Sequence, residues 1–109
     1  MVISEGKVIY EMKRSIDEIK RIVSPIAESH GVNRLCLFGS RAKGTETDSS
    51  DYDFVISKGD ISGFISYMAF INALEDALGT HVDVVTDTSE DVDFLDLIKH
   101  DEVLLYERS

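Results

Sequence analysis

The sequence predicts an α/β or α+β domain in which helices cover one face of a sheet and the other face is partly open. Two long segments repeat apolar residues at helical spacing, and the side chains at 52, 54 and 56 alternate with those at 51, 53 and 55 in the period of two that is typical of a strand with distinct faces. Short apolar runs suited to strands separate the helical segments. Hydrophobic residues make up 43% of the 109 residues, which is enough for the core of one domain spanning residues 1–109.

The first helix is expected to follow Ser15, because Ser15 and Glu18 fit a capping box that satisfies free N–H groups at a helix start. Apolar residues at helical spacing continue beyond this point. Pro25 lies inside the pattern, and we expect it either to kink the helix or to restart it with Ser24 as a new cap. Gly31 is expected to end the helix.

The rest of the chain alternates strands and helices. The apolar run at 35–38 is typical of a buried strand and ends at Gly39. A small, polar loop follows up to Ser50, with room for one helical turn at 41–43. The remaining predictions are an edge strand at 8–10, a strand at 52–56, a turn at 58–60, a helix at 64–78 stopped by Gly79, a strand at 82–85, a helix at 94–98 and a strand at 103–106.

The chain is strongly acidic, with 11 Lys and Arg residues against 21 Asp and Glu residues and a formal net charge of −10. Binding of DNA or RNA relies on Lys and Arg side chains that neutralise phosphates, so we expect no direct nucleic-acid binding. An acidic protein that handles phosphates would do so through divalent cations held by its carboxylates.

Sequence features also predict the compartment. No apolar run approaches the roughly 18–20 residues of a membrane span, and the N-terminus lacks the pattern of a signal peptide. The single cysteine, Cys36, allows no internal disulfide and no cysteine framework for zinc, and we expect it in the core. We therefore expect a cytoplasmic protein without membrane contact.

Three aspartates on predicted strands are the candidate metal ligands. Asp51 and Asp53 are two residues apart, so their side chains project from the same face of a strand. Asp83 joins them on the open face if its flanking valines point toward the helices and the two strands are adjacent. Two like charges about 4 Å apart repel by roughly 4 kcal/mol at an effective dielectric near 20, so the cluster requires a cation. Carboxylate oxygens favour Mg²⁺.

The loop before these aspartates is suited to an anion. Gly39 lets the backbone approach a ligand closely, and Ser40 offers a hydroxyl and an N–H at the start of a helical turn. Arg41 and Lys43 supply positive charge in an otherwise acidic chain. We expect these four residues to bind phosphate.

Two segments, 37–44 (LFGSRAKG) and 50–54 (SDYDF), resemble the GS-x10-DxD signature of the polymerase-β-like nucleotidyltransferase superfamily. In its small size, the chain most resembles the minimal nucleotidyltransferase (MNT) branch of this superfamily. The likeness covers about residues 15–107, with 81–85 (HVDVV) as the strand of the third carboxylate. It implies a mixed sheet with helices on one face and the active site on the other.

The resemblance implies a nucleotidyltransferase that moves AMP from ATP to a hydroxyl acceptor. MNT proteins commonly act as the antitoxin of a toxin–antitoxin module and modify a tyrosine of a HEPN-domain ribonuclease, so a HEPN partner is expected. The implied site residues are Gly39 and Ser40 at the nucleotide, with Arg41 and Lys43 as further phosphate contacts, Asp51 and Asp53 at two Mg²⁺ ions, and Asp83 as a third ligand that helps deprotonate the attacking hydroxyl.

Other interpretations compete with this one. An MNT-fold binding protein could neutralise its partner by complex formation alone, although the intact GS and three aspartates favour an enzyme. Transfer to a small molecule usually involves an added domain. A phosphohydrolase with an aspartate nucleophile would place its DxD after an apolar strand, whereas Asp51 and Asp53 precede one. The aspartates could also be a solvated strand face. His30, His81 and His100 are expected to be surface or structural residues, with His81 on the face of Asp83.

Overall fold

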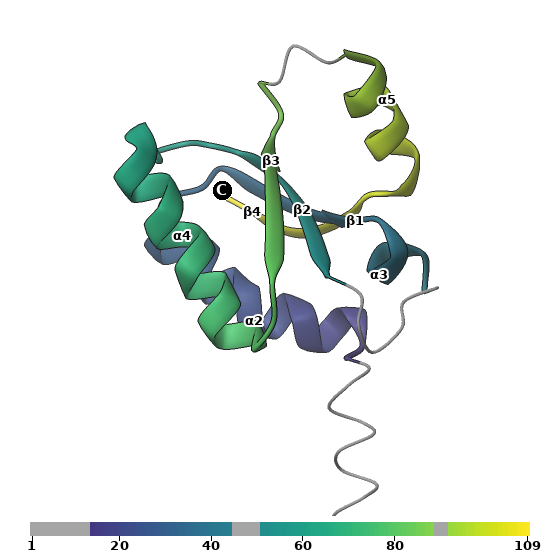
Figure 1. The fold of residues 1–109 in the computed structure, drawn as a ribbon, viewed down its shortest axis with the longest axis horizontal. Coiled ribbons are helices and arrows are strands. Elements are labelled where there is room, and N and C mark those ends of the chain that lie inside the picture. The colour runs from purple at the N-terminus through teal and green to yellow at the C-terminus, as the bar shows by residue number, and fades with distance from the viewer. Residues whose placement is uncertain (1–13, 45–50, 89–91) are drawn as a thin grey trace, which may run out of the picture.

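Four strands form one mixed sheet in the order β3-β2-β1-β4 (Figure 1). The computed structural model describes residues 14–44, 51–88 and 92–109, so the edge strand predicted at 8–10 lies outside the described residues. β1 pairs antiparallel with both β2 and β4, whereas β2 pairs parallel with β3. The strands are β1 (Arg34–Phe38), β2 (Tyr52–Ser57), β3 (Val82–Thr86) and β4 (Val103–Glu107).

The helices occupy the connections between strands. α4 makes the crossover that a parallel pair requires, here between β2 and β3. α2 contacts both α4 and β4, while the single turn of α3 lies against β1 (Figure 1). The helices are α2 (Ile16–Ser29), α3 (Ser40–Lys43), α4 (Gly63–Leu78) and α5 (Val92–Asp101). In the described part of the chain, none of them has the length and apolar character that crossing a membrane requires.

The capping box that starts α2 is confirmed, because the Glu18 N–H donates to Ser15 Oγ at 3.1 Å. Of the two alternatives expected at Pro25, a kink or a restart capped by Ser24, the restart does not occur, since one helix runs through Pro25. Pro25 is exposed, so water can reach the Arg21 carbonyl that loses its helical hydrogen bond there. The Ser24 hydroxyl instead donates to the Leu105 carbonyl of β4 at 3.2 Å.

The main core lies between one face of the sheet and the two long helices. The alternation along β2 is confirmed, because Tyr52, Phe54 and Ile56 are all buried on this face. They pack with buried residues of α2 and α4, among them Val23 and Phe70. The sheet face toward α2 and α4 is therefore the apolar one.

The opposite face of the sheet has two parts. Cys36 and Val55 are buried there and pack against Phe38 and against Leu95 of α5. α5 thus covers a section of the sheet face that was predicted to be partly open. The uncovered section carries Asp53 and its neighbours, at the ends of the strands next to α3.

Candidate functional site

The loop after β1 approaches β2 closely because Gly39 has no side chain. Its backbone angles, φ 77° and ψ −157°, fall in a region that is essentially restricted to glycine. A Cβ atom on Gly39 would lie 2.6 Å from Asp53 Oδ2, which is far inside van der Waals contact. The GS loop backbone therefore lies directly beside the second carboxylate of the DxD motif.

The predicted adjacency of the two aspartate-bearing strands is confirmed. Asp53 and Asp83 are directly opposite each other in the parallel pairing of β2 with β3. Asp51 precedes β2, and the next N–H, that of Tyr52, donates to the His81 carbonyl at 3.4 Å. This pairing brings all three aspartates to one end of the sheet.

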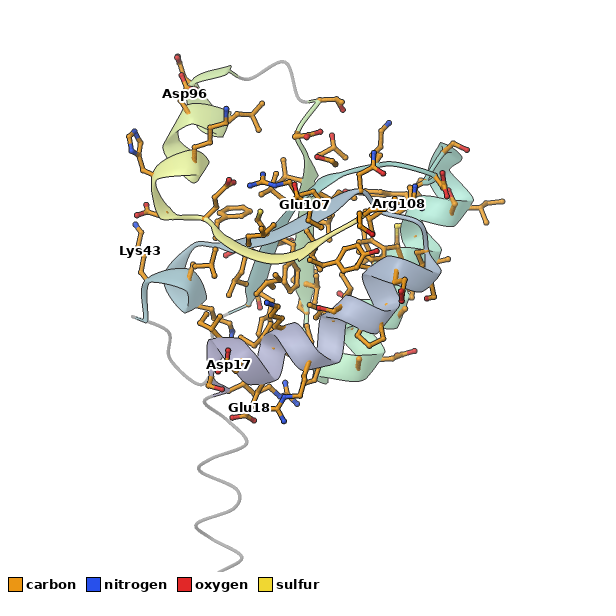
Figure 2. All side chains as sticks on the ribbon, turned by 180° about the vertical axis from the view of Figure 1, so that it is seen from behind. Asp17, Glu18, Lys43, Asp96, Glu107 and Arg108 are labelled. Atoms are coloured by element: carbon orange, nitrogen blue, oxygen red, sulfur yellow. The ribbon has the colours of Figure 1, made fainter. Side chains whose placement is uncertain are left out.

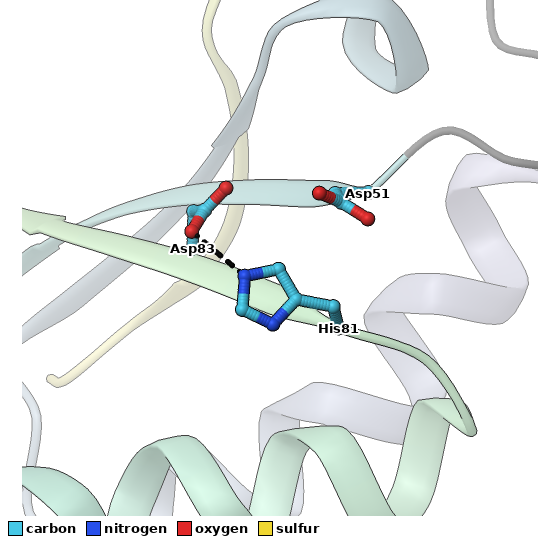
Figure 3. Close-up of side chains that lie close together, drawn as sticks. All are labelled: Asp51, His81 and Asp83. Atoms are coloured by element: carbon cyan, nitrogen blue, oxygen red, sulfur yellow. Dashed lines mark hydrogen bonds and ion pairs between the residues drawn. The ribbon is translucent and has the colours of Figure 1, made fainter.

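A histidine joins the exposed part of this cluster. Asp51, His81 and Asp83 each offer one ligand atom, and these atoms all lie within 4.8 Å of one another (Figure 3). Asp53 is half-buried, beside Gly39. The cluster therefore has an outer group of three exposed side chains and an inner carboxylate.

The electrostatics of Asp53 reflect this crowding. Its pKa is raised above the ordinary aspartate value, first by partial burial and then by the negative charges of Asp83 and Asp51. The charge of His81 acts in the opposite direction. Like charges held this close favour a bound cation, and a set rich in carboxylate oxygens fits Mg²⁺.

His81 lies between two carboxylates. Its Nε2 is 3.1 Å from Asp83 Oδ1, and its Nδ1 is 3.1 Å from Glu75 Oε2. The same Glu75 oxygen accepts the Val82 N–H at 3.1 Å, which ties the C-terminal part of α4 to the start of β3. The pKa of His81 is raised, mainly by its hydrogen bond with Asp83.

From the sequence, His81 is expected to be a surface or structural residue. Its side chain is indeed 60% exposed, but it belongs to the carboxylate cluster. Its position on the face of Asp83 is as expected from the spacing of two residues along a strand, and the same spacing is the signal that could have assigned it to the cluster. Glu75 had no such signal, since its position depends on the turn between α4 and β3.

Tyr52, between the two aspartates of the DxD motif, is held from two sides. Arg14 Nη1 donates to the Tyr52 hydroxyl at 3.2 Å and to the Leu78 carbonyl at 2.8 Å. The Arg41 guanidinium carbon lies 3.9 Å from the centroid of the Tyr52 ring, in a cation–π contact. These contacts fix the side chain that points away from the carboxylates.

The two basic residues of the loop therefore differ in their surroundings. Arg41 is only 7% exposed and packs on Tyr52. Lys43 is exposed at the end of α3 (Figure 2). Its Nζ forms an ion pair at 3.3 Å with Asp101 Oδ2, at the end of α5. Contact of either residue with a nucleotide stays a prediction.

This chain is similar to known proteins both in sequence and in structure. The chain is 38% identical over 72 residues, covering 66% of this chain and 77% of the relative, to a Methanocaldococcus jannaschii protein named "Putative protein adenylyltransferase MJ0435". A toxin–antitoxin complex with AMP-PNP contains a chain of similar fold, with a TM-score of 0.71 and 21% identity over 83% of this chain and 74% of that one.

A second solved complex holds a tri-AMPylated Shewanella oneidensis HEPN toxin with its MNT antitoxin. One chain of that complex has a similar fold, with a TM-score of 0.66 and 17% identity over 86% of this chain and 74% of the matched chain. The predicted fold is thereby confirmed. The family model for polymerase beta nucleotidyltransferases matches residues 20–109, which include the GS loop and all three aspartates. The chain therefore belongs to the polymerase beta nucleotidyltransferase family.

Proposed function

We propose that this protein transfers AMP from ATP to a tyrosine hydroxyl of a HEPN-domain toxin and thereby acts as its antitoxin. The observation that carries the proposal is the gathering of Asp51, Asp53 and Asp83 at one end of the sheet, beside Gly39. The protein adenylyltransferase relative and the fold shared with MNT antitoxins support the choice of reaction and partner.

The three carboxylates are the groups that would hold two Mg²⁺ ions. Their mutual repulsion, expressed in the raised pKa of Asp53, is the feature that a bound cation would relieve. Bound Mg²⁺ would neutralise charge on the phosphates and lower the pKa of the attacking hydroxyl.

The protein's own residues bind and orient the reactants. Gly39 and Ser40 would hold the triphosphate against the loop backbone, next to Asp53. Asp83 would accept the proton of the tyrosine hydroxyl, whose oxygen then forms a bond to the α-phosphorus of ATP. The bond between the α-phosphorus and its bridging oxygen to the β-phosphate breaks, and pyrophosphate leaves with that bonding pair.

The exposure of the site supports an acceptor on another protein. Asp51 and Asp83 are both exposed, so the tyrosine of a docked protein can reach them. His81 Nε2 lies 3.1 Å from Asp83 Oδ1, beside the carboxylate that would face the acceptor. Position then accounts for much of the rate, because the reacting oxygen is held in line with the leaving pyrophosphate.

The test is label transfer to a HEPN-domain protein encoded in the same genome. With α-labelled ATP and Mg²⁺, the wild-type protein should label the partner on tyrosine, and Asp51→Asn and Asp53→Asn should each abolish the label. Asp76→Asn is the matched control, because Asp76 is an exposed aspartate on α4 outside the cluster.

Two outcomes contradict the proposal. A wild-type protein that binds the partner but transfers no label would favour neutralisation by complex formation alone. The same conclusion would follow if Asp51→Asn and Asp53→Asn both protected cells from the toxin as fully as the Asp76→Asn control.

A further inference from the structure

The outer group of the cluster contains a nitrogen donor that the DxD signature does not include. Asp51, His81 and Asp83 present one ligand atom each within 4.8 Å of one another. Two ligands on opposite sides of a divalent ion, with bonds of about 2.1 Å, lie about 4.2 Å apart. Only one pair of the three can be opposite, and adjacent ligands lie about 3 Å apart, as His81 Nε2 and Asp83 Oδ1 already do at 3.1 Å. Side-chain rotation of these exposed residues would have to bring the remaining ligand atom into place around one ion.

The surroundings of His81 match those of a metal-binding histidine. Histidine ligands generally donate the other ring N–H to a carboxylate, which fixes the tautomer and the orientation of the ring. Here Nδ1 lies 3.1 Å from Glu75 Oε2, on the side away from Asp83. Glu75 is itself held by the Val82 N–H at 3.1 Å. With the Nδ1 proton donated to Glu75, release of the Nε2 proton would free a lone pair on the side of the carboxylates.

We propose that His81 binds a divalent ion through Nε2 together with Asp51 and Asp83, and that this donor makes the site favour Mn²⁺ over Mg²⁺. Mg²⁺ strongly prefers oxygen ligands, whereas transition-metal ions of the first row accept imidazole nitrogen. Nε2 lies 3.1 Å from Asp83 Oδ1. On binding, the metal takes the place of the Nε2 proton, which leaves to solvent. The inference rests on the metal site of the proposed function.

The alternative is that His81 only positions Asp83 by a hydrogen bond. His81→Gln separates the two roles, because a glutamine amide can donate to Asp83 but is a poor metal ligand. His30→Gln is the matched control, since the His30 Nδ1 contacts the Ile26 carbonyl at 2.9 Å, outside the cluster.

The experiment measures Mn²⁺ and Mg²⁺ binding to the full chain without ATP or partner. Free Mn²⁺ is followed by electron paramagnetic resonance, and Mg²⁺ by competition against bound Mn²⁺. We expect His81→Gln to weaken Mn²⁺ binding about 10-fold or more and Mg²⁺ binding less than about 3-fold. Glu75→Ala should weaken Mn²⁺ binding in the same direction, and His30→Gln should leave both ions unaffected.

A spectroscopic readout is independent of affinity. Electron spin echo spectra of Mn²⁺ bound to the wild-type protein should contain a ¹⁴N coupling from a directly bound imidazole, and His81→Gln should remove it. Absence of the coupling in the wild type, or equal weakening of both ions by His81→Gln, would overturn the proposal. If Mn²⁺ binds through nitrogen but no AMP reaches a HEPN protein, only the proposed function fails.

Discussion

Gly39→Ala is the substitution that tests the geometry of the site most directly. Gly39 adopts φ 77° and ψ −157°, and forcing a residue with a side chain into this region costs about 1–3 kcal/mol. The added methyl group would also lie 2.6 Å from Asp53 Oδ2 and 3.4 Å from Asp53 Cγ. The first distance is shorter than real Cβ atoms tolerate, so the Asp53 carboxylate must move.

The movement of Asp53 sets the expected loss of function. A displacement of about 1 Å in a group that positions reactants costs on the order of 100-fold in rate. We therefore expect Gly39→Ala to lower AMP transfer about 100-fold, to weaken Mg²⁺ binding, and to lower the free energy of unfolding by about 1–3 kcal/mol. Urea denaturation and label transfer to the HEPN-domain protein of the proposed function measure the two effects on the same preparation.

Gly44→Ala is the matched control. Gly44 also has a positive φ, 78°, at the end of α3, but among the residues that the structure describes no atom lies within 4 Å of a Cβ built there. This variant should lose about 1–2 kcal/mol to backbone strain and keep its AMP transfer. The reasoning is refuted if Gly39→Ala transfers AMP as fast as Gly44→Ala, because the Asp53 carboxylate would then not depend on the bare backbone of Gly39.

Three further variants test other parts of the arrangement. Asp53→Asn removes a charge opposite Asp83, so it should raise the unfolding free energy of the metal-free protein by about 0.5–1 kcal/mol in urea titrations, and a loss of stability would contradict this. A double-mutant cycle of Arg41→Met with Tyr52→Leu should give a coupling energy of about 1–2 kcal/mol, whereas additive effects would count against the cation–π contact. Burial raises the pKa of the Cys36 thiol to about 11, so iodoacetamide at pH 8 should alkylate the folded protein far more slowly than the unfolded one, and rapid alkylation of the folded protein would contradict the burial. The contribution of this thiol to the free energy of unfolding is full below about pH 9 and is lost as the pH rises through 11.

Local patterns in the sequence predicted most elements of the fold, because each pattern depends only on the residues of its own helix or strand. The alternation of Tyr52, Phe54 and Ile56 required one buried strand face, and the capping box at Ser15 required a helix start. Pro25 was harder to interpret, because its cost depends on whether water can hydrate the freed carbonyl. That depends on which side of α2 faces solvent, which is a property of the packed domain.

The site depends on contacts that spacing alone does not specify. The face shared by Asp51 and Asp53 follows from strand periodicity, but the pairing of Asp53 with Asp83 needs β2 and β3 to be neighbours. That adjacency is produced by the crossover through α4, and the resemblance to the family was what made it expected. The pair of Glu75 with His81 had no signal in the sequence, because it forms across the turn that starts β3.

Tyr52 explains why Asp51 and Asp53 are oriented before any ligand binds. Side chains alternate along a strand, so fixing the direction of one residue fixes the opposite direction of its two neighbours. Arg14 holds the Tyr52 hydroxyl, Arg41 covers its ring, and the buried core surrounds the rest of the side chain. The rotation of the strand about its own axis is thereby restricted, and the flanking carboxylates are directed away from the core. Tyr52 is thus a positioning residue, since it acts on the site through its two neighbours.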